Sequence, residues 1–348
     1  MSSEEQKLLV SMIEQFAKTE LENAAQKIEK EGISTDLRKR LAELGLLAAT
    51  IPQSEGGSGI DRKSFSLILM TLAKYSASAA YFTYLQNTLV NELLFKSQNK
   101  KEEIAKIASG EATATLVHDL NLNFQHEIFV KGSDLYGSNN FVTLPDADIH
   151  LVLARSEGSS YLIHAKPAST GIRKPLGFRG LSFGNVNYKA EIGSDKIIFK
   201  DAENILQNHF FETGDQIAAI ALGMSESAIE KAIEYSKERK AFESYLYEFQ
   251  PISAALIDMK GRIEELKKAL MLTESVQEKI TLKLNSLETA RLASRIALQI
   301  HGGYGYLEDL GVERYYRDSM HLTMLASNYV KEMKALSKDV IAPDAFKI

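Results

Sequence analysis

The prolines of this chain divide its 348 residues into three blocks. Three of the six prolines lie between residues 145 and 175, whereas only Pro52 precedes this region and only Pro251 lies between it and Pro343. Proline removes a backbone donor and clashes with the preceding helical turn, so long segments that lack it favour helices. We therefore expect two helical blocks on either side of a middle block with a different structure.

The outer blocks carry apolar residues at helical intervals. The first block shows this pattern from Leu8 to Phe16, and the third block shows it over residues 256–272 and 284–298. Apolar residues that recur every three or four positions are typical of amphipathic helices that share a core. Both outer blocks are therefore predicted to be helical bundles.

The middle block changes period. Short apolar runs at residues 151–154, 161–164 and 196–199 are separated by glycine, serine and proline, which is typical of strands. We interpret this block as a small antiparallel, barrel-like sheet. The expected organisation is an N-terminal helical domain at residues 1–111, a middle β domain at residues 112–202 and a C-terminal four-helix bundle at residues 203–348.

Composition restricts the partners of the chain. A net charge of −5 offers no basic surface for a nucleic-acid backbone, and no apolar run approaches the roughly 18 residues of a membrane span. The chain has no cysteine for disulfides or metal ligation, and its seven histidines are scattered. The acidic N-terminus does not resemble a signal peptide. We expect a cytoplasmic protein that binds neither nucleic acid, membrane nor metal.

Glycines interrupt a helical segment near the C-terminus. Residues 299–306 read Gln-Ile-His-Gly-Gly-Tyr-Gly-Tyr, and residues 313–318 read Glu-Arg-Tyr-Tyr-Arg-Asp. Glycine lets backbone amides approach a ligand closely, although such a segment can also be a simple turn between helices. Together the two segments resemble the C-terminal signature of the acyl-CoA dehydrogenase family, a family of flavoproteins. The resemblance implies that Gln299, Gly302 and Gly303 bind FAD.

A second segment carries an independent match. Residues 235–242 end in Arg-Lys-Ala-Phe, and the Phe-Gln pair at 249–250 follows at the interval where the family opens its next helix. Arginine's planar, charged fork can pair with a pyrophosphate, and glutamine can both donate and accept near a flavin. Such a segment in isolation is usually a solvated helix face. The resemblance implies that Arg239, Phe242 and Gln250 bind the cofactor.

A third match lies in the middle block. Residues 135–143 read Leu-Tyr-Gly-Ser-Asn-Asn-Phe-Val-Thr and are followed by Ala147 and Asp148. They resemble the family's strand Leu-x-Gly-x-Lys-x-[Phe/Trp]-Ile-Thr and its Ala-Asp pair. In the family this strand meets the flavin ring, which implies the same role for Phe141, Val142 and Thr143. Taken alone, the segment reads equally well as an edge strand with a core phenylalanine.

Two parts of the family pattern are missing. Residues 112–122 replace the segment Thr-Glu-Pro-x-x-Gly-Ser-Asp, whose hydroxyls and amides contact the flavin in the family. The two positions at which family members carry the catalytic glutamate hold Ala326 and Thr213. Glu212 and Asp215 lie beside the second position but face other directions around a helix. The sequence therefore assigns no catalytic base.

The resemblance implies a fold, a cofactor and a reaction. It covers nearly the whole chain and implies an α+β multidomain fold like that of acyl-CoA dehydrogenases, with FAD as cofactor and an acyl-CoA or other acyl thioester as substrate. The expected activity is FAD-dependent oxidoreduction at a CH–CH bond in fatty acid metabolism. The expected assembly is a homo- or hetero-oligomer, either a dimer or a homotetramer. The missing base leaves two alternatives, a partner subunit that completes another chain's flavin site and a flavin monooxygenase of the same fold.

Overall fold

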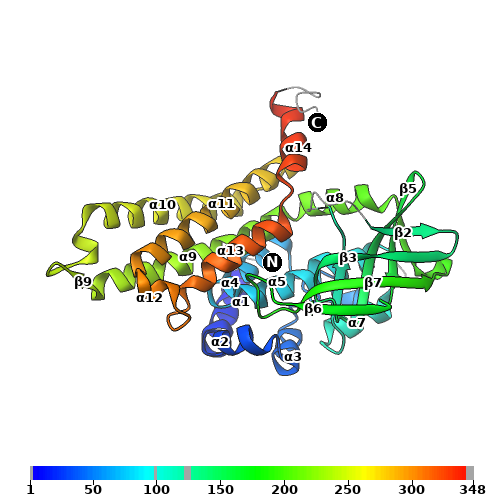
Figure 1. Ribbon diagram of the computed structural model, residues 1–348, viewed down its shortest axis with the longest axis horizontal. Coiled ribbons are helices and arrows are strands. Elements are labelled where there is room, and N and C mark those ends of the chain that lie inside the picture. Colours follow the sequence, from blue (N-terminus) through cyan, green and yellow to red (C-terminus); the bar gives the residue numbers. More distant parts are fainter. Residues whose placement is uncertain (1–2, 98–99, 121–126, 342–348) are drawn as a thin grey trace.

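The computed structural model describes residues 3–97, 100–120 and 127–341, and it confirms the predicted order of helices, sheet and helices. The sheet lies at one end of the molecule's long axis, and long C-terminal helices extend to the other end (Figure 1). Within the described ranges, no helix is long and apolar enough to cross a membrane. The same ranges contain no group of three acidic or histidine side chains that could hold a metal ion.

The N-terminal part consists of helices that pack around a common core. Asp61 begins one of them, since its carboxylate accepts a hydrogen bond from the Ser64 amide at 2.9 Å. The elements are α1 (Ser3–Phe16), η1 (Ala17–Leu21), α2 (Glu22–Glu31), α3 (Thr35–Glu43), η2 (Gln53–Glu55), α4 (Arg62–Tyr75), α5 (Ala77–Tyr84), η3 (Leu85–Asn91), α6 (Glu92–Lys96) and α7 (Lys101–Ala108).

The middle part is an open sheet. Its strands are β1 (Ala114–Val117), β2 (Ile128–Lys131), β3 (Asp134–Thr143), β4 (Ile149–Ser156), β5 (Ser159–Ala165), β6 (Ser169–Arg173), β7 (Phe183–Glu191) and β8 (Ile197–Lys200), with a short helix η4 (Ser194–Lys196) before β8. The strand order is β6-β7-β3-β2-β4-β5-β8, and β1 pairs with β4. Most neighbours are antiparallel, but β1 and β2 run parallel to β4. Among the described strands β6 and β8 end this order and do not pair with each other, so the sheet is open and does not close into a barrel.

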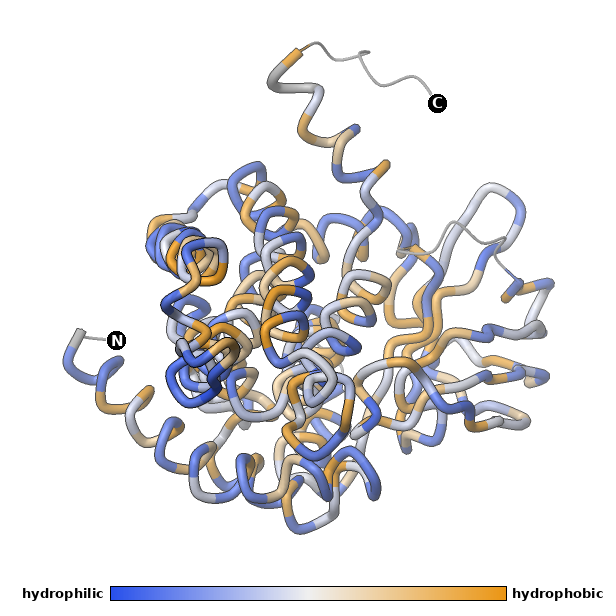
Figure 2. Tube along the Cα trace, turned by 60° about the vertical axis from the view of Figure 1, so that its left-hand side comes forward, coloured by the Kyte–Doolittle hydropathy of each residue, from blue (hydrophilic) through white to orange (hydrophobic). Residues whose placement is uncertain are grey.

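Strand β4 is buried on both faces of the sheet. Leu151 and Leu153 belong to the large core shared with the helices, whereas Val152 and Ala154 belong to a separate core on the other face of the sheet. Alternate residues of a strand point to opposite faces, so a strand buried on both sides must be apolar throughout. Hydrophobic segments gather in the interior where helices and sheet meet, and hydrophilic segments lie at the periphery (Figure 2).

The C-terminal part is a bundle of long helices. Helix α9 is buried along most of its length. A Cβ atom added at its Gly223 would lie 2.2 Å from the Met70 carbonyl oxygen on α4, so only glycine permits this close helix contact. The elements are α8 (Ala202–Glu212), α9 (Gly214–Glu238), β9 (Lys240–Ala241), β10 (Ser244–Tyr245), η5 (Leu246–Glu248), α10 (Gln250–Leu272), α11 (Val276–His301), α12 (Gly303–Tyr306), α13 (Val312–Ala326) and α14 (Tyr329–Val340).

Arg317 and Asp318 on α13 form hydrogen bonds with both the N-terminal and the middle part of the chain. Arg317 donates to Glu29 on α2 at 2.7 Å and to the Leu176 carbonyl at 3.2 Å. Asp318 accepts a hydrogen bond from the Phe178 amide at 2.6 Å. The segment that leaves β6 is thereby fixed to both α2 and α13. Burial, with a further contribution from Glu29, raises the pKa of the Asp318 carboxyl to about 7.

We predict that Asp318 makes the stability of the fold depend on pH. The pKa of Asp318 is higher in the folded chain than in the unfolded chain, so protonated Asp318 stabilises the fold fully below about pH 4. This stabilisation is lost as the pH rises through 7, at up to about 1.4 kcal/mol per pH unit. In Asp318→Asn this dependence should disappear. Urea unfolding between pH 5 and pH 8 measures it, with Asp258→Asn on the exposed side of α10 as the matched control. Identical pH profiles for the Asp318 variant and the parent would contradict the assignment.

Candidate functional site

A small cavity lies where the three parts of the chain meet. Its walls come from α5 and η3, from β1 and the end of β3, and from α13. It encloses about 30 Å³ and is lined by Tyr81, Leu85, Leu89, Thr115, Leu116, His118, Phe141, Thr143, Met324 and Leu325. We call it the junction cavity. Its enclosed volume is close to the share of one water molecule in the liquid, so a larger group can enter only if these side chains move apart.

Two of the three predicted flavin-contacting residues of β3 line this cavity. Phe141 is partly exposed, and Thr143 is buried beside it. The Thr143 backbone oxygen accepts a hydrogen bond from the Thr115 hydroxyl at 2.6 Å, but its own hydroxyl is buried without a partner among the described residues. An unsatisfied buried hydroxyl costs roughly 1–3 kcal/mol, which a polar ligand in the cavity would recover. The side chain of Val142 lies in the sheet core instead, as strand alternation requires.

A second cavity lies at the far end of the bundle and contains three other predicted residues. It encloses about 470 Å³ and is lined by Tyr235, Arg239, Leu246, Ile300, His301, Gly302, Gly303, Tyr304 and Leu307. We call it the bundle-end cavity. Gly302 ends α11 with φ 57°, as the glycine pattern predicted. A Cβ added at Gly302 or Gly303 would meet nothing within 4 Å, so packing inside this chain does not explain these glycines.

The remaining predicted residues lie near this cavity but do not line it. Gln250 begins α10 and Gln299 lies in the last turn of α11, and both are exposed. Phe242 is 95% exposed at the tip of the β9–β10 hairpin. Phe242 and Glu243 form its two-residue turn with φ 51° and 68°, so Glu243 adopts the left-handed backbone that the family's glycine would adopt easily.

The two cavities lie far apart in one chain. Figure 1 shows β9 and α12 at one end of the long axis, whereas the elements that line the junction cavity lie where the helices meet the sheet. The predicted residues therefore fall into two groups, with Thr143 at the junction cavity and Arg239 at the bundle-end cavity.

None of the residues that line the junction cavity is acidic. Ala326 ends α13 directly after the lining residue Leu325, and Thr213 is buried with its hydroxyl bonded to the His209 carbonyl at 2.8 Å. Glu212 forms an ion pair with Lys96, 3.8 Å away. Asp215 accepts a hydrogen bond from Ser66 at 3.2 Å, and burial raises the pKa of its carboxyl. Glu212 and Asp215 therefore lie outside the cavity.

Sequence reasoning missed His118 as a candidate for the site. It lines the junction cavity directly after β1, within the segment 112–122 that had been noted only for its lost motif. Burial lowers the pKa of its imidazole to about 4. A histidine that directly follows a short, mostly apolar strand and precedes an aspartate was the available signal.

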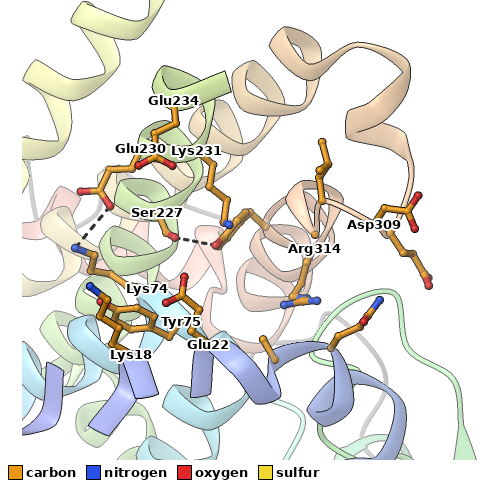
Figure 3. A pocket seen from close by; sticks show the side chains of 16 residues that line it. Lys18, Glu22, Lys74, Tyr75, Ser227, Glu230, Lys231, Glu234, Asp309 and Arg314 are labelled. Carbon is orange, nitrogen blue, oxygen red and sulfur yellow. Dashed lines mark hydrogen bonds and ion pairs between the residues drawn. The ribbon is translucent and has the colours of Figure 1, made fainter. Parts of the chain in front are cut away.

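A polar groove of about 420 Å³ lies elsewhere, between α2, α4, α9 and α13 (Figure 3). Charged side chains of both signs line it. Lys74 lies 3.7 Å from Glu230, and the hydroxyls of Ser227 and Tyr315 are 2.7 Å apart. Burial raises the pKa of Glu230. None of the residues that the resemblance assigns to FAD lines this groove.

The architecture of two helical bundles around an open sheet, with a cavity at their junction, defines an acyl-CoA dehydrogenase-like fold. The model of the acyl-CoA dehydrogenase N-terminal domain matches residues 3–111, and that of the C-terminal domain matches residues 215–326. The chain belongs to the acyl-CoA dehydrogenase family.

Individual relatives are distant but extend over most of the chain. The 3-(aryl)acrylate reductase of Clostridium sporogenes is 25% identical, covering 91% of this chain and 93% of its own length. The mitochondrial short-chain specific acyl-CoA dehydrogenase of Rattus norvegicus is 27% identical, covering 87% and 82%. The structure of butyryl-CoA dehydrogenase from Megasphaera elsdenii matches with a TM-score of 0.87 at 21% identity, covering 98% of this chain and 99% of that chain. That likeness shows the shared fold.

Proposed function

We propose that this chain is an FAD-dependent oxidoreductase that acts on a CH–CH bond of an acyl thioester. The observation that carries the proposal is the unsatisfied hydroxyl of Thr143 in a cavity at the junction of the three parts of the chain. The relatives include a short-chain specific acyl-CoA dehydrogenase and an acryloyl-CoA reductase, which are named for opposite directions of such a reaction. Family membership and this cavity together support the assignment.

In this proposal the two cavities have different roles in binding the cofactor and the substrate. FAD, when bound, supplies two-electron redox chemistry at the substrate's β-carbon. The Thr143 hydroxyl would orient a polar group at the junction cavity. Arg239 would hold a pyrophosphate at the bundle-end cavity. The apolar side chains around the junction cavity exclude water, which strengthens polar contacts there.

The names of the relatives favour a short acyl group. Tyr81, Leu85 and Leu89 recur every four residues along α5 and η3 and present one continuous apolar face to the junction cavity. Three relatives are named as short-chain specific acyl-CoA dehydrogenases, from Rattus norvegicus, Mus musculus and Clostridium acetobutylicum, which supports this preference.

Flavin spectroscopy tests the proposed function. The purified chain, reconstituted with FAD, should be yellow, and anaerobic addition of short acyl-CoAs or enoyl-CoAs to oxidised or reduced protein should change the flavin spectrum. A chain that retains no FAD, or whose flavin responds to no thioester in either direction, would contradict the proposal.

A second candidate function is a partner subunit that completes another chain's flavin site. One contrast favours it. The junction cavity has no acidic residue that could act as a base, whereas the bundle-end cavity is open and lined by the predicted cofactor residues Arg239, Gly302 and Gly303. Co-expression with a family member that carries the catalytic glutamate distinguishes the two functions. A partner subunit should raise the flavin content of the mixed complex while contributing no turnover of its own.

We predict that Arg239→Ala weakens FAD binding by about 10- to 150-fold, because a hydrogen bond to a charged group contributes roughly 1.5–3 kcal/mol. Arg239→Lys keeps the charge without the planar fork and should give an intermediate affinity. Titration of the flavin-free protein with FAD measures both variants. Arg291→Ala, which removes only a surface ion pair with Glu288, is the control. Unchanged FAD affinity in Arg239→Ala would exclude the proposed contact.

We also propose that the chain forms an oligomer, at least a dimer and in its complete form a tetramer. The predicted cofactor residues fall into two groups at separate cavities, and association of two chains would let one chain's group complete the other's. Exposed apolar side chains near the bundle-end cavity, including Phe242 and Tyr306, support an interface there. Light scattering should give a mass that is a multiple of 38.7 kDa. A stable 38.7 kDa species with bound FAD would contradict this proposal.

A further inference from the structure

We propose that the polar groove between α2, α4, α9 and α13 binds a small zwitterion, a molecule that carries one carboxylate and one ammonium group. The carboxylate binds to cations and hydroxyls on the floor of the groove, and the ammonium group binds to acidic side chains at its rim. The volume of about 420 Å³ is within the usual range for small-molecule sites. This inference does not depend on the proposed function, because no residue that the resemblance assigns to FAD lines the groove.

Two cations on the floor of the groove make no hydrogen bond within the part of the chain that the structure describes. Lys231 on α9 is partly buried and also has no ion pair there. The side chain of Arg314 on α13 is 17% exposed, and its Nε lies 3.5 Å from Glu29 without a hydrogen bond. Glu29 instead accepts hydrogen bonds from Arg317 at 2.7 Å and 3.3 Å. The planar fork of Arg314 can therefore pair with the carboxylate of a ligand.

Two hydroxyl groups join the helices that carry these cations. Ser227 lies one helical turn before Lys231 on α9, and Tyr315 follows Arg314 on α13. Their oxygens are 2.7 Å apart, so one hydroxyl donates to the other. The hydrogen of the second hydroxyl remains to donate to a ligand oxygen. Figure 3 shows Lys231 and Arg314 extending from their helices into the same groove as this pair.

Acidic side chains at the rim of the groove disfavour a simple anion. Glu22 on α2 and Glu234 on α9 are exposed, and within the described ranges neither forms a hydrogen bond or an ion pair. The whole lining contains five acidic and four basic side chains. The rim carboxylates repel an anion that approaches the floor, whereas they attract the ammonium group of a zwitterion. A ligand with both charges is therefore attracted at both ends.

A bound zwitterion should also stabilise the fold. The walls of the groove come from α2 and α4 in the N-terminal part and from α9 and α13 in the C-terminal part. A ligand that contacts several of these helices binds the folded chain and not the unfolded one. Its addition should therefore raise the melting temperature as its concentration increases.

Isothermal titration calorimetry with the full chain tests the site. The probes are glycine, β-alanine and γ-aminobutyrate, which differ in the separation of their charges, and butyrate and butylamine are the single-charge analogues. At least one amino acid should bind about 10-fold more tightly than either analogue, because each analogue loses a charged contact.

Variants of the lining locate the bound amino acid. Lys231→Met and Arg314→Gln each remove a contact to the carboxylate and should weaken binding by about 10- to 150-fold. Glu22→Gln removes an exposed attraction and should weaken binding by up to about 5-fold. Arg295→Gln, exposed on α11 and outside the groove, is the control and should bind like the parent.

Three results would overturn the proposal. The first is that none of the amino acids binds at millimolar concentrations or raises the melting temperature. The second is that butyrate binds as tightly as γ-aminobutyrate, which would make the groove a site for simple anions. The third is an unchanged affinity in Lys231→Met. This variant decides the location even if Arg314→Gln does not fold, since Lys231 has no ion pair to lose within the described ranges.

Discussion

Replacement of Ala326 by glutamate is expected to accelerate flavin reduction by acyl-CoA by about 10²- to 10⁴-fold, because a positioned general base contributes a factor of this size. Ala326 directly follows Leu325, which lines the junction cavity, and no lining residue of that cavity is acidic. The unmodified chain should therefore reduce its flavin very slowly with any thioester. Anaerobic stopped-flow mixing with short-, medium- and long-chain acyl-CoAs measures the rate.

The matched control is Ala326→Gln, which has the same size and cannot accept the proton. It should remain as slow as the parent. Rapid flavin bleaching by the unmodified chain would show that a base exists elsewhere. Alanine replacements of Glu212 and Asp215 would then identify it, although the structure places neither in the junction cavity.

Lys283→Met is expected to lower the free energy of unfolding by about 3–5 kcal/mol, because it leaves a buried carboxylate without its counter-charge. The side chains of Lys283 on α11 and Glu332 on α14 form an ion pair, and each is only 2% exposed. Lys283 also donates to the Ala326 carbonyl at 3.0 Å, and Glu332 accepts from the Ser327 hydroxyl at 2.6 Å. The pair thus fixes the turn between α13 and α14. Denaturant unfolding measures the loss.

A double variant shows whether the unpaired charge is the cause. Lys283→Met combined with Glu332→Leu removes both charges and should be more stable than Lys283→Met alone, since an apolar pair can replace a buried ion pair at little cost. Lys268→Met, exposed on α10, should unfold like the parent. Equal losses in the single and double variants would attribute the effect to packing and not to charge.

Much of the fold was predictable because its determinants are local. Proline placement predicted the alternation of helix, sheet and helix, and the glycines at 302 and 303 predicted where α11 ends. The open form of the sheet was not predictable. The parallel pairing of β1 with β4 joins strands that are separated by β2 and β3 in the sequence, and no short pattern specifies that pairing.

The site was predictable residue by residue but not as an arrangement. Motifs selected Thr143 and Arg239 as cofactor residues, yet spacing along a chain does not show that one lines the junction cavity and the other the bundle-end cavity. Val142 was selected with its neighbours although strand alternation turns its side chain into the sheet core. His118 was overlooked because its position at the junction cavity exists only in the folded chain.

The β9–β10 hairpin affects the stability of the monomeric chain. Its tip holds Phe242 almost wholly in water, and two residues other than glycine maintain its left-handed turn. Strained backbone of this kind costs roughly 1–3 kcal/mol per residue, and the exposed ring gains nothing until another surface covers it. Burial of this ring in the proposed interface would recover its hydrophobic free energy, although the strain of the turn would remain, so the stability of the proposed oligomer should depend on protein concentration. Dilution should therefore lower the stability of the fold in the absence of any denaturant.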